Sequence, residues 1–571
     1  DTRTGNGIHV LNSADGGQMW EHLYEPGQNH WMQARAMQVG EHVWVLAKGQ
    51  WRALERRTGS VERTLPGWHN HCFPPVATVR YLLGGEMNHV EIATGQAGAN
   101  QISKGNCDRN AGFLPANGLL YTSPKHCSCY PMLKSYSALA PAKAKPSSPP
   151  EPGAPVLERG PAWGAKAGEA PVATGDWPGY RGDVWRSAST TAPGPKKLDV
   201  LWTSRIGAWP DVPAAVDWKE NLYGRGPLTP PVSAGALVVA AEIDGHRVVA
   251  LDAASGGQTW EFTANGRIDT PPTLYGGLCL FGTRSGWAYC LRASDGALVW
   301  RMRPGPGDER IVSFGQLESP WPVAGSPLVI DGILYMAAGR HPLADGGVRV
   351  LAIEPDSGRV AWVKMISSLP MTQFYGGAAL EFEPIDLLTA EARRADEEGA
   401  DYITMSRWQI DPAGTTMKVA WESGFVLCRN GKGGVLVPRG VWTYGQRMQY
   451  ISSGPKPGQP DFIGVTPRPL AAFRGSMLLC SSEDKHTLFR RDFSEADLAN
   501  FDEKWFNQRH LPRGLKPGDR SRSHRLARGA AWSKTLFPPG AGGSGQQIAG
   551  IALAGDAVFV VGSQGRLIAV D

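Results

Sequence analysis

One strand-turn-strand pattern recurs along this sequence, and it constrains the fold more than any other feature. The segment from Val248 to Trp260 recurs from Ala288 to Trp300 and again from Val350 to Trp362. A fourth copy runs from Val10 to Trp20, and Arg52 to Val61 fits without the tryptophan. Alternating apolar residues flank a turn whose glycine can adopt a positive φ, so each copy predicts a β-hairpin.

A second hairpin precedes several copies. It begins with a proline and carries a glycine before alternating apolar residues, as in Pro231 to Val239, Pro272 to Phe281 and Pro327 to Tyr335. Together the two hairpins give a four-stranded antiparallel sheet in each unit of roughly 40 residues. So small a sheet cannot bury both faces alone, so the units are expected to stack radially. The sequence therefore predicts an all-β fold, a single β-propeller, with the repeated tryptophan packed between neighbouring blades.

The two ends of the sequence predict how the ring closes. Residues 546–571 supply the first part of a unit and stop before its tryptophan-bearing strand, whereas residues 1–20 contain such a strand. One blade built from both termini would remove exposed sheet edges. Counting this shared blade, the repeats give about eight or nine units, and we expect eight blades, with seven as an alternative.

The chain is expected to divide into three parts. Residues 1–140 hold irregular blades with a cysteine-rich insertion, 141–172 form a Pro/Ala-rich surface linker, and 173–571 hold the remaining blades. Insertions are expected near 370–405 and 500–545. Within the first of them, residues 384–400 predict a short helix, with Pro384 at its start and Gly399 at its end.

Charge and hydropathy exclude some classes of function. A net charge of +5 over 571 residues is not a nucleic-acid signature, and no apolar run is long enough to span a membrane. Much of the positive excess lies in one stretch, which predicts either a solvated loop or a docking surface for an acidic partner: Arg509, Arg513, Lys516, Arg520, Arg522, Arg525 and Arg528. No signal peptide precedes Asp1, which suggests either processing or a fragment.

Eight cysteines form an even set, and half of them cluster near the N-terminus. Cys72, Cys107, Cys127 and Cys129 predict disulfide staples in an extracytoplasmic protein. A metal site is the alternative. Cys107, His126, Cys127 and Cys129, perhaps joined by His69 or His71, carry ligands suited to zinc or copper. Free thiols are the third option. Cys279 and Cys290 are expected on adjacent strands of one blade.

The alternation of these two hairpins resembles the pyrroloquinoline-quinone-like repeat of quinoprotein alcohol dehydrogenases and of the outer-membrane assembly lipoprotein. Asp176 to Asp183, with its Trp-Pro-Gly-Tyr-Arg-Gly-Asp core, is similar to the opening of many such propellers. Gln316 to Pro322, Ala337 to Arg340 and Pro115 to Tyr121 resemble segments of large secreted bacterial propellers. The resemblance is specific for the fold, whereas this fold hosts dehydrogenases, a hydrolase and scaffolds.

The quinoprotein resemblance implies a pyrroloquinoline quinone on the propeller axis, beside a calcium or lanthanide ion held by carboxylates and an asparagine. It also implies a disulfide between two adjacent cysteines, and this sequence has no Cys-Cys pair. Glu318, Asp345 and Asp211 are candidate acids to which the sequence assigns no role.

Three functions follow as hypotheses. The first is an extracytoplasmic, periplasmic or secreted, binding or scaffold module that engages an envelope protein or glycan through its rim loops or central funnel. The second is a quinoprotein oxidoreductase of small alcohols or sugars. The third is a non-quinone enzyme with a funnel site around Glu318, Trp321, Arg340 and the cysteine-rich segment. The sequence contains no recognisable catalytic motif, which favours the first.

Overall fold

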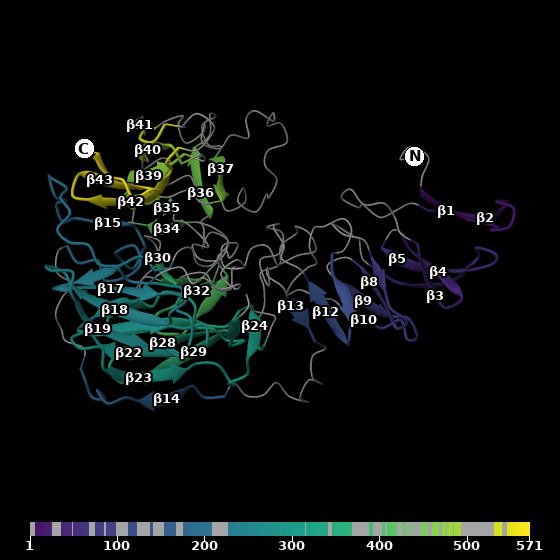
Figure 1. The fold of residues 1–571 in the computed structure, drawn as a ribbon, viewed down its shortest axis with the longest axis horizontal. Helices are drawn as coiled ribbons and strands as arrows, with labels where there is room; N and C mark the ends of the chain where they lie inside the picture. Colours follow the sequence, from purple (N-terminus) through teal and green to yellow (C-terminus); the bar gives the residue numbers. More distant parts are fainter. Residues whose placement is uncertain are drawn as a thin grey trace. The chain divides into compact units, whose positions relative to one another are not determined.

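In the computed structural model, all regular structure in the described residues is β-strand (Figure 1). The structure describes residues 6–24, 36–47, 49–67, 75–84, 87–98, 112–122, 137–140, 153–166, 175–207, 227–313, 316–340, 345–367, 388–391, 402–405, 408–419, 426–429, 434–436, 447–453, 460–467, 471–475, 477–482, 485–492, 530–538 and 545–570. The all-β prediction is therefore confirmed across this part of the chain.

Contacts divide the chain into two compact units. Unit 1 comprises Asp1–Pro149 with Val312–Gln316, and unit 2 comprises Pro150–Ile311 with Leu317–Asp571. The boundary after Pro149 falls inside the stretch predicted as a linker. Each unit is described by itself below.

Unit 1 contains small antiparallel sheets that share apolar cores around buried tryptophans such as Trp44 and Trp51. In sheet order their strands are β1 (Asn6–Leu11) and β2 (Gln18–Tyr24); β3 (Met37–Val39), β4 (His42–Ala47), β5 (Gln50–Glu55) and β6 (Val61–Pro66); β10 (Ala97–Gly98), β9 (Asn88–Glu91), β8 (Tyr81–Gly84) and β7 (Val76–Ala77); and β11 (Leu114–Ala116), β12 (Leu119–Thr122) and β13 (Ser137–Leu139).

Unit 2 repeats a four-stranded antiparallel sheet in which sequence order and sheet order agree. These sheets consist of β16 (Val232–Ala234), β17 (Leu237–Glu242), β18 (Arg247–Asp252) and β19 (Gln258–Thr263); β20 (Thr273–Tyr275), β21 (Leu278–Gly282), β22 (Ala288–Arg292) and β23 (Leu298–Arg303); β26 (Leu328–Ile330), β27 (Ile333–Ala338), β28 (Val348–Ile353) and β29 (Val360–Ile366); β30 (Thr389–Glu391), β31 (Tyr402–Met405), β32 (Trp408–Ile410) and β33 (Met417–Val419); and β38 (Ala471–Arg474), β39 (Met477–Ser481), β40 (Thr487–Asp492) and β41 (Trp532–Thr535).

Other strands extend or supplement these sheets. β14 (Val156–Arg159) pairs with β23 as a fifth strand, and β15 (Ser189–Thr190) pairs in parallel with β42. The remaining strands are β24 (Ile311–Ser313) with β25 (Gln316–Glu318), β34 (Val426–Arg429) with β35 (Gly434–Leu436), β36 (Arg447–Ser453) with β37 (Pro460–Pro467), and the meander of β42 (Ile548–Ala554), β43 (Ala557–Gly562) and β44 (Leu567–Val570).

The repeated sequence pattern forms the last two strands of each sheet, as predicted. Val248 to Trp260 becomes β18, a turn and β19, and the turn glycine Gly256 has a φ of 71°. The pairing shifts register at the same place in each copy, between Ala250 and Leu251 and between Cys290 and Leu291. The repeated sequence therefore specifies both the two strands and the position of the irregularity in their pairing.

The repeated tryptophan packs between neighbouring sheets. Trp260 on β19 donates its indole N–H to the carbonyl of Ala293, 2.7 Å away, in the turn of the next sheet. Trp300 makes the same contact with Pro355 at 2.8 Å. Each indole ring lies against the turn glycine of that next sheet, Gly296 or Gly358. The predicted packing role is confirmed.

The helix predicted for residues 384–400 is wrong where the structure describes it. Thr389–Glu391 is strand β30, which pairs antiparallel with β31. Its backbone pairing satisfies the hydrogen-bonding groups that a helix would have satisfied internally, so tertiary contacts override a local helical preference. Residues 384–387 and 392–400 lie outside the described residues.

The predicted number of eight blades is not confirmed, because the sheets fall into two units and parts of the chain lie outside the described residues. The pairing expected between residues 1–20 and the C-terminal meander is not among those of the described residues. There, β2 pairs with β1, and the strand beside β42 is β15.

Among the side chains that the structure describes, three cysteines are buried free thiols: Cys279, Cys290 and Cys480. Cys279 and Cys290 do lie on adjacent strands, β21 and β22, as predicted. Their side chains belong to different apolar clusters, on opposite sides of the sheet. The cysteines and histidines of the predicted disulfides and metal site, Cys72, Cys107, His126, Cys127 and Cys129, lie outside the described residues, as do His69 and His71.

Candidate functional site

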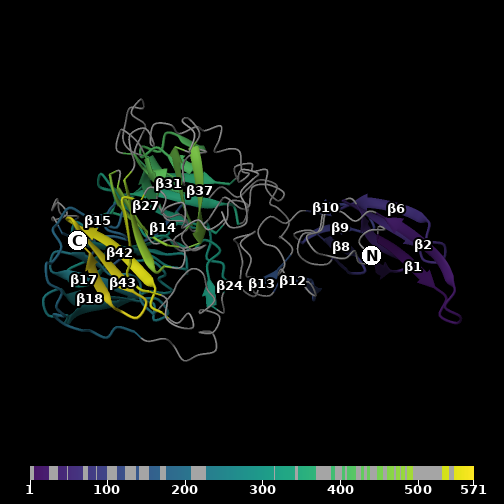
Figure 2. The same cartoon turned by 90° about the horizontal axis from the view of Figure 1, so that it is seen from above.

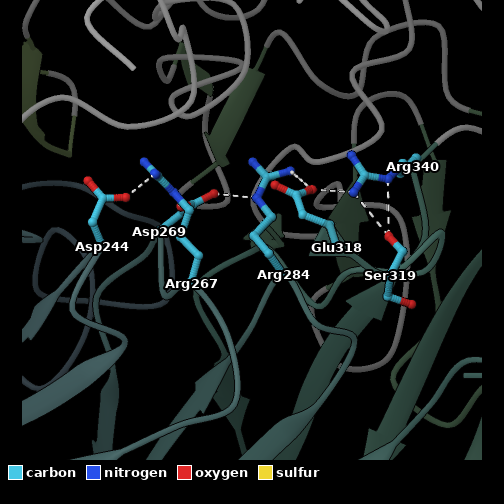
Figure 3. Close-up of polar contacts among 7 residues, drawn as sticks. All are labelled: Asp244, Arg267, Asp269, Arg284, Glu318, Ser319 and Arg340. Atoms are coloured by element: carbon cyan, nitrogen blue, oxygen red, sulfur yellow. Dashed lines mark hydrogen bonds and ion pairs between the residues drawn. The ribbon is translucent and has the colours of Figure 1, made fainter. Parts of the chain in front are cut away.

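A cluster of buried charged side chains in unit 2 lies at one end of three consecutive sheets. Antiparallel order places the β17–β18 and β21–β22 loops and the β19–β20 connection at the same sheet end. The connection leading into β26 and the residues after β27 follow the same pattern. Six ionisable residues of these segments have side chains no more than 12% exposed, and we call them the charged row: Asp244, Arg267, Asp269, Arg284, Glu318 and Arg340 (Figure 3).

Acidic and basic side chains alternate along the row. Arg267 donates from Nη1 to Asp244 and from Nε to Asp269. Arg284 donates from Nε to the other oxygen of Asp269. Asp269 therefore accepts a hydrogen bond from one guanidinium on each side. Such charge-assisted contacts are stronger than neutral hydrogen bonds.

The row continues into the third sheet through Glu318. Its Oε2 lies 3.8 Å from Nη1 of Arg284 and accepts a hydrogen bond from Nη2 of Arg340. Arg340 also donates to the carbonyl of Ser319 from Nε at 3.2 Å and from Nη2 at 3.0 Å. The charges thus link loops from three neighbouring sheets.

The backbones of the same loops are joined as well. The amide of Arg284 donates to the carbonyl of Arg267, and the amide of Ser319 donates to the carbonyl of Arg284, both at 2.9 Å. The contacts of Arg284 with Asp269 and with Glu318 are therefore each accompanied by a main-chain hydrogen bond between the same loops. Loops held in both ways are preorganised, because little conformational freedom remains to be lost on binding.

Burial makes the charges of the row interdependent. The Asp269 side chain is 2% exposed, and burial alone would raise the pKa of this carboxyl. The charges and hydrogen bonds of Arg284 and Arg267 outweigh burial and lower the pKa to about 2. Asp269 is therefore ionised at neutral pH and serves as a fixed counter-charge rather than as a proton acceptor.

Glu318 is the least exposed acid of the row, at 1%. Its Oε2 accepts a hydrogen bond from Arg340, whereas its buried Oε1 has no hydrogen-bond partner among the described residues. An unsatisfied buried polar atom costs roughly 1–3 kcal/mol. Oε1 of Glu318 therefore has acceptor capacity to spare.

The structure brings together the three residues singled out for a funnel site. Glu318 pairs with Arg340, and Trp321 lies three residues further along the same loop. Trp321 donates its indole N–H to the carbonyl of Asp345 at 2.7 Å, and its amide donates to Oγ of Ser319 at 3.1 Å. Because its ring is buried, Trp321 anchors the loop. Asp211 lies outside the described residues.

Sequence reasoning missed four members of the row: Asp244, Arg267, Asp269 and Arg284. The available signal was their position, since each lies in a loop directly between repeat strands, at the end opposite the Asp/Ser-Gly turns. Charged residues at equivalent loop positions of successive repeats are expected to face one another. No single spacing of residues identifies them.

The described residues do not fit the calcium–quinone site that the quinoprotein resemblance implies. In the part of the chain that the structure describes, no three His, Cys, Asp or Glu side chains converge as metal ligands. The acids of the charged row each contact at least one guanidinium, which takes up oxygens that a hard cation would need.

Comparison with known families gives one match. Residues 182–367, which include the whole charged row, match the family model described as outer membrane protein assembly factor BamB. A comparison with curated proteins found no match. In the described residues, no helix has the length and apolar character needed to cross a membrane.

Solved structures with the same kind of fold are similar at low identity. BamB from Moraxella catarrhalis is 12% identical, with 59% of this chain and 79% of that chain covered and a TM-score of 0.30. A quinohemoprotein alcohol dehydrogenase from Pseudomonas putida HK5 is 13% identical, with 69% and 70% covered and a TM-score of 0.32. The quinohemoprotein alcohol dehydrogenase from Comamonas testosteroni is 12% identical, with 70% of this chain and 72% of that chain covered and a TM-score of 0.31.

The repeated four-stranded sheets, the recurring geometry of their turns and the family match define the class of protein. The chain is a β-propeller protein built from pyrroloquinoline-quinone-like repeats. Within it, residues 182–367 are the part that matches the family model described as outer membrane protein assembly factor BamB.

Proposed function

We propose that the chain is an extracytoplasmic binding module that engages another envelope protein through the loop end of unit 2. The observation that carries this proposal is the charged row itself. It fixes loops of three sheets in one arrangement, and its fully ionised Asp269 is held between two arginines. Loops fixed in this way are suited to rigid recognition, because little ordering cost remains on binding.

The type of partner and the location rest on the family match. Residues 182–367 are similar to a family described as an outer membrane protein assembly factor, and such a role involves contact with other proteins of the envelope. This favours a protein partner over a glycan. It also supports an extracytoplasmic location. The charged row does not support the quinoprotein alternative, because the acids of the row are paired with arginines.

Site-specific photo-crosslinking tests the proposal. A crosslinking amino acid replaces Glu309, an exposed residue on the connection between β23 and β26, at the loop end. The matched control replaces Ala254, an exposed residue of the β18–β19 turn at the opposite end. We expect a discrete adduct from position 309 only, with mass spectrometry identifying an extracytoplasmic protein.

A quinone titration provides the opposing test. Purified protein is titrated with pyrroloquinoline quinone and calcium while tryptophan fluorescence is recorded. We expect no saturable quenching at micromolar concentrations. Saturation at one quinone per chain, together with alcohol-dependent reduction of a dye, would replace the binding module with an oxidoreductase. Equal adducts from positions 309 and 254 would instead remove the assignment of the loop end.

A further inference from the structure

The segment 177–190 contacts the first strand of one sheet after another. Trp177 exchanges two backbone hydrogen bonds with Ser233 of β16, each 2.9 Å long. The carbonyl of the next residue, Pro178, accepts from the amide of Leu274 on β20 at 2.7 Å. The segment thus begins by joining the first two sheets of unit 2.

Arg186 extends these contacts to two more sheets. Its Nη2 donates to the carbonyls of Ser326 and Pro327, which precede β26, at 3.2 and 3.1 Å. It also lies 3.3 Å from the carbonyl of Leu388, which precedes β30. Burial lowers the pKa of this guanidinium to about 10, so it keeps its charge at neutral pH.

The end of the segment reaches the last two sheets. The carbonyl of Ser187 accepts from the amide of Phe473 on β38, and that of Ala188 from Leu553 on β42, both at 2.9 Å. The next two residues form β15, which pairs with β42. One short segment therefore bonds to the first strands of six sheets, or to residues directly preceding them, and the chain then continues to Trp202.

Trp202 makes the contact that the repeated tryptophans make. Its indole N–H donates to the carbonyl of Ala253 at 2.9 Å, and its ring lies against the turn glycine Gly256. Trp260 and Trp300 make this contact from the fourth repeat strand of the preceding sheet, β19 or β23. Trp202 therefore stands where the fourth repeat strand of a sheet preceding β16–β19 would place its tryptophan.

The sheet that lacks such a strand is the C-terminal one. Within the described residues, β44 pairs with β43 and has no strand on its other side. Trp177 bonds to β16 and also packs against the apolar cluster of β38–β44, so it contacts both the first and the last sheet of unit 2. In Figure 1, β15 lies between β42 and β43 above and β17 and β18 below, and Figure 2 shows these strands on the same side of unit 2.

We propose that residues 177–202 are a strap that closes unit 2 by tying its last sheet, β42–β44, to its first sheet, β16–β19, with Trp202 as the closing residue. In this arrangement unit 2 closes without residues 1–20. The strap concerns how the fold is held together and does not depend on what the loop end binds.

Hydrogen–deuterium exchange of the full chain tests the strap. Trp202→Ala removes the closing contact but leaves residues 177–190 in place. We expect amide exchange about tenfold faster both in the β18–β19 turn and in β42–β44, although these regions are some 300 residues apart. Faster exchange in the turn alone would overturn the proposal, since Trp202 would then only cover Gly256.

Two further variants keep the test interpretable. Trp20→Ala removes the same kind of contact in unit 1, where Trp20 donates to Arg56 at 3.0 Å beside Gly59. It should leave exchange in β42–β44 unchanged, and faster exchange there would contradict a closure specific to Trp202. If Trp202→Ala does not fold, Trp202→Phe keeps a ring over Gly256 and loses only the hydrogen bond. It should accelerate exchange in both regions by a smaller factor, and a purely local effect would again exclude the strap.

Discussion

Asp269 and Arg284 form an ion pair in which both side chains are almost completely buried, at 2% and 4% exposure. Removing one charge of such a pair leaves the other uncompensated in a low-dielectric environment. We therefore expect Asp269→Asn to lower the free energy of unfolding by about 3–5 kcal/mol. Chemical denaturation at pH 7 measures this loss.

The chain offers a matched control for this substitution. Arg292 and Asp295 also form an arginine–aspartate pair, but both side chains are more than 40% exposed. Exposed pairs contribute only about 0–1 kcal/mol, so Asp295→Asn should cost less than about 1 kcal/mol. Similar losses in the two variants would mean that burial does not set the strength of the row.

The pH dependence of the free energy of unfolding should reveal the contribution of the Asp269 carboxylate. The folded pKa of Asp269 is about 2, below the ordinary value of 3.8, so its contribution is complete above pH 4 and is lost as the pH falls toward 2. The shift corresponds to roughly 2 kcal/mol. Urea denaturation of the wild type at pH 6, 4 and 2.5 should show this loss, whereas Asp269→Asn should show a shallower decline. Parallel curves would assign the acid sensitivity to other groups.

Glu318 and Arg340 should prove strongly coupled. Either Glu318→Met or Arg340→Met alone leaves one buried charge, with an expected cost of about 3–5 kcal/mol. The double variant removes both charges and should cost clearly less than the sum of the single costs. A double-mutant cycle by denaturation measures the difference. Additive costs would show that the two side chains contribute independently.

The repeats, turns and packing tryptophans could be predicted from the sequence because their chemistry is local. A turn glycine and the tryptophan of its hairpin lie within a few residues of each other, as in Gly256 and Trp260. Alternation along a strand likewise reports its own burial. These features recur at a fixed period, so each copy supports the others.

The charged row could not be predicted, because its partners are brought together only by the sheets. Arg267 pairs with Asp244, and Arg340 with Glu318, across intervening strands. Their spacing depends on hairpin lengths that differ from blade to blade. The helix predicted for residues 384–400 failed for a related reason. Ala390 bonds to the carbonyl of Val184, some 200 residues earlier, and this contact is invisible to local propensity.

The packing of Trp300 provides a quantitative test of the repeated tryptophan. Its ring is fully buried, and its N–H donates to the carbonyl of Pro355. Trp300→Ala should cost about 3–5 kcal/mol through the cavity it leaves. Trp300→Phe keeps most of the ring but leaves that carbonyl unpaired, at about 1–3 kcal/mol. Thermal and urea denaturation give both values. The partly exposed Trp163 is the control, and Trp163→Phe should change stability by less than about 0.5 kcal/mol.

The buried thiols should be inert in the folded protein. Burial raises the pKa of both Cys279 and Cys480 to about 12, and that of Cys290 well above its usual value. Because the thiolate is the reactive form and these sulfur atoms are shielded from solvent, iodoacetamide at pH 8 should leave all three unmodified and should label them after denaturation. Site-resolved mass spectrometry distinguishes the two states.

The same experiment, run with and without prior reduction, tests the predicted disulfides of Cys72, Cys107, Cys127 and Cys129. Labelling of these four after denaturation without a reductant would exclude those disulfides, and labelling of Cys279 in the native protein would contradict the burial of its sheet.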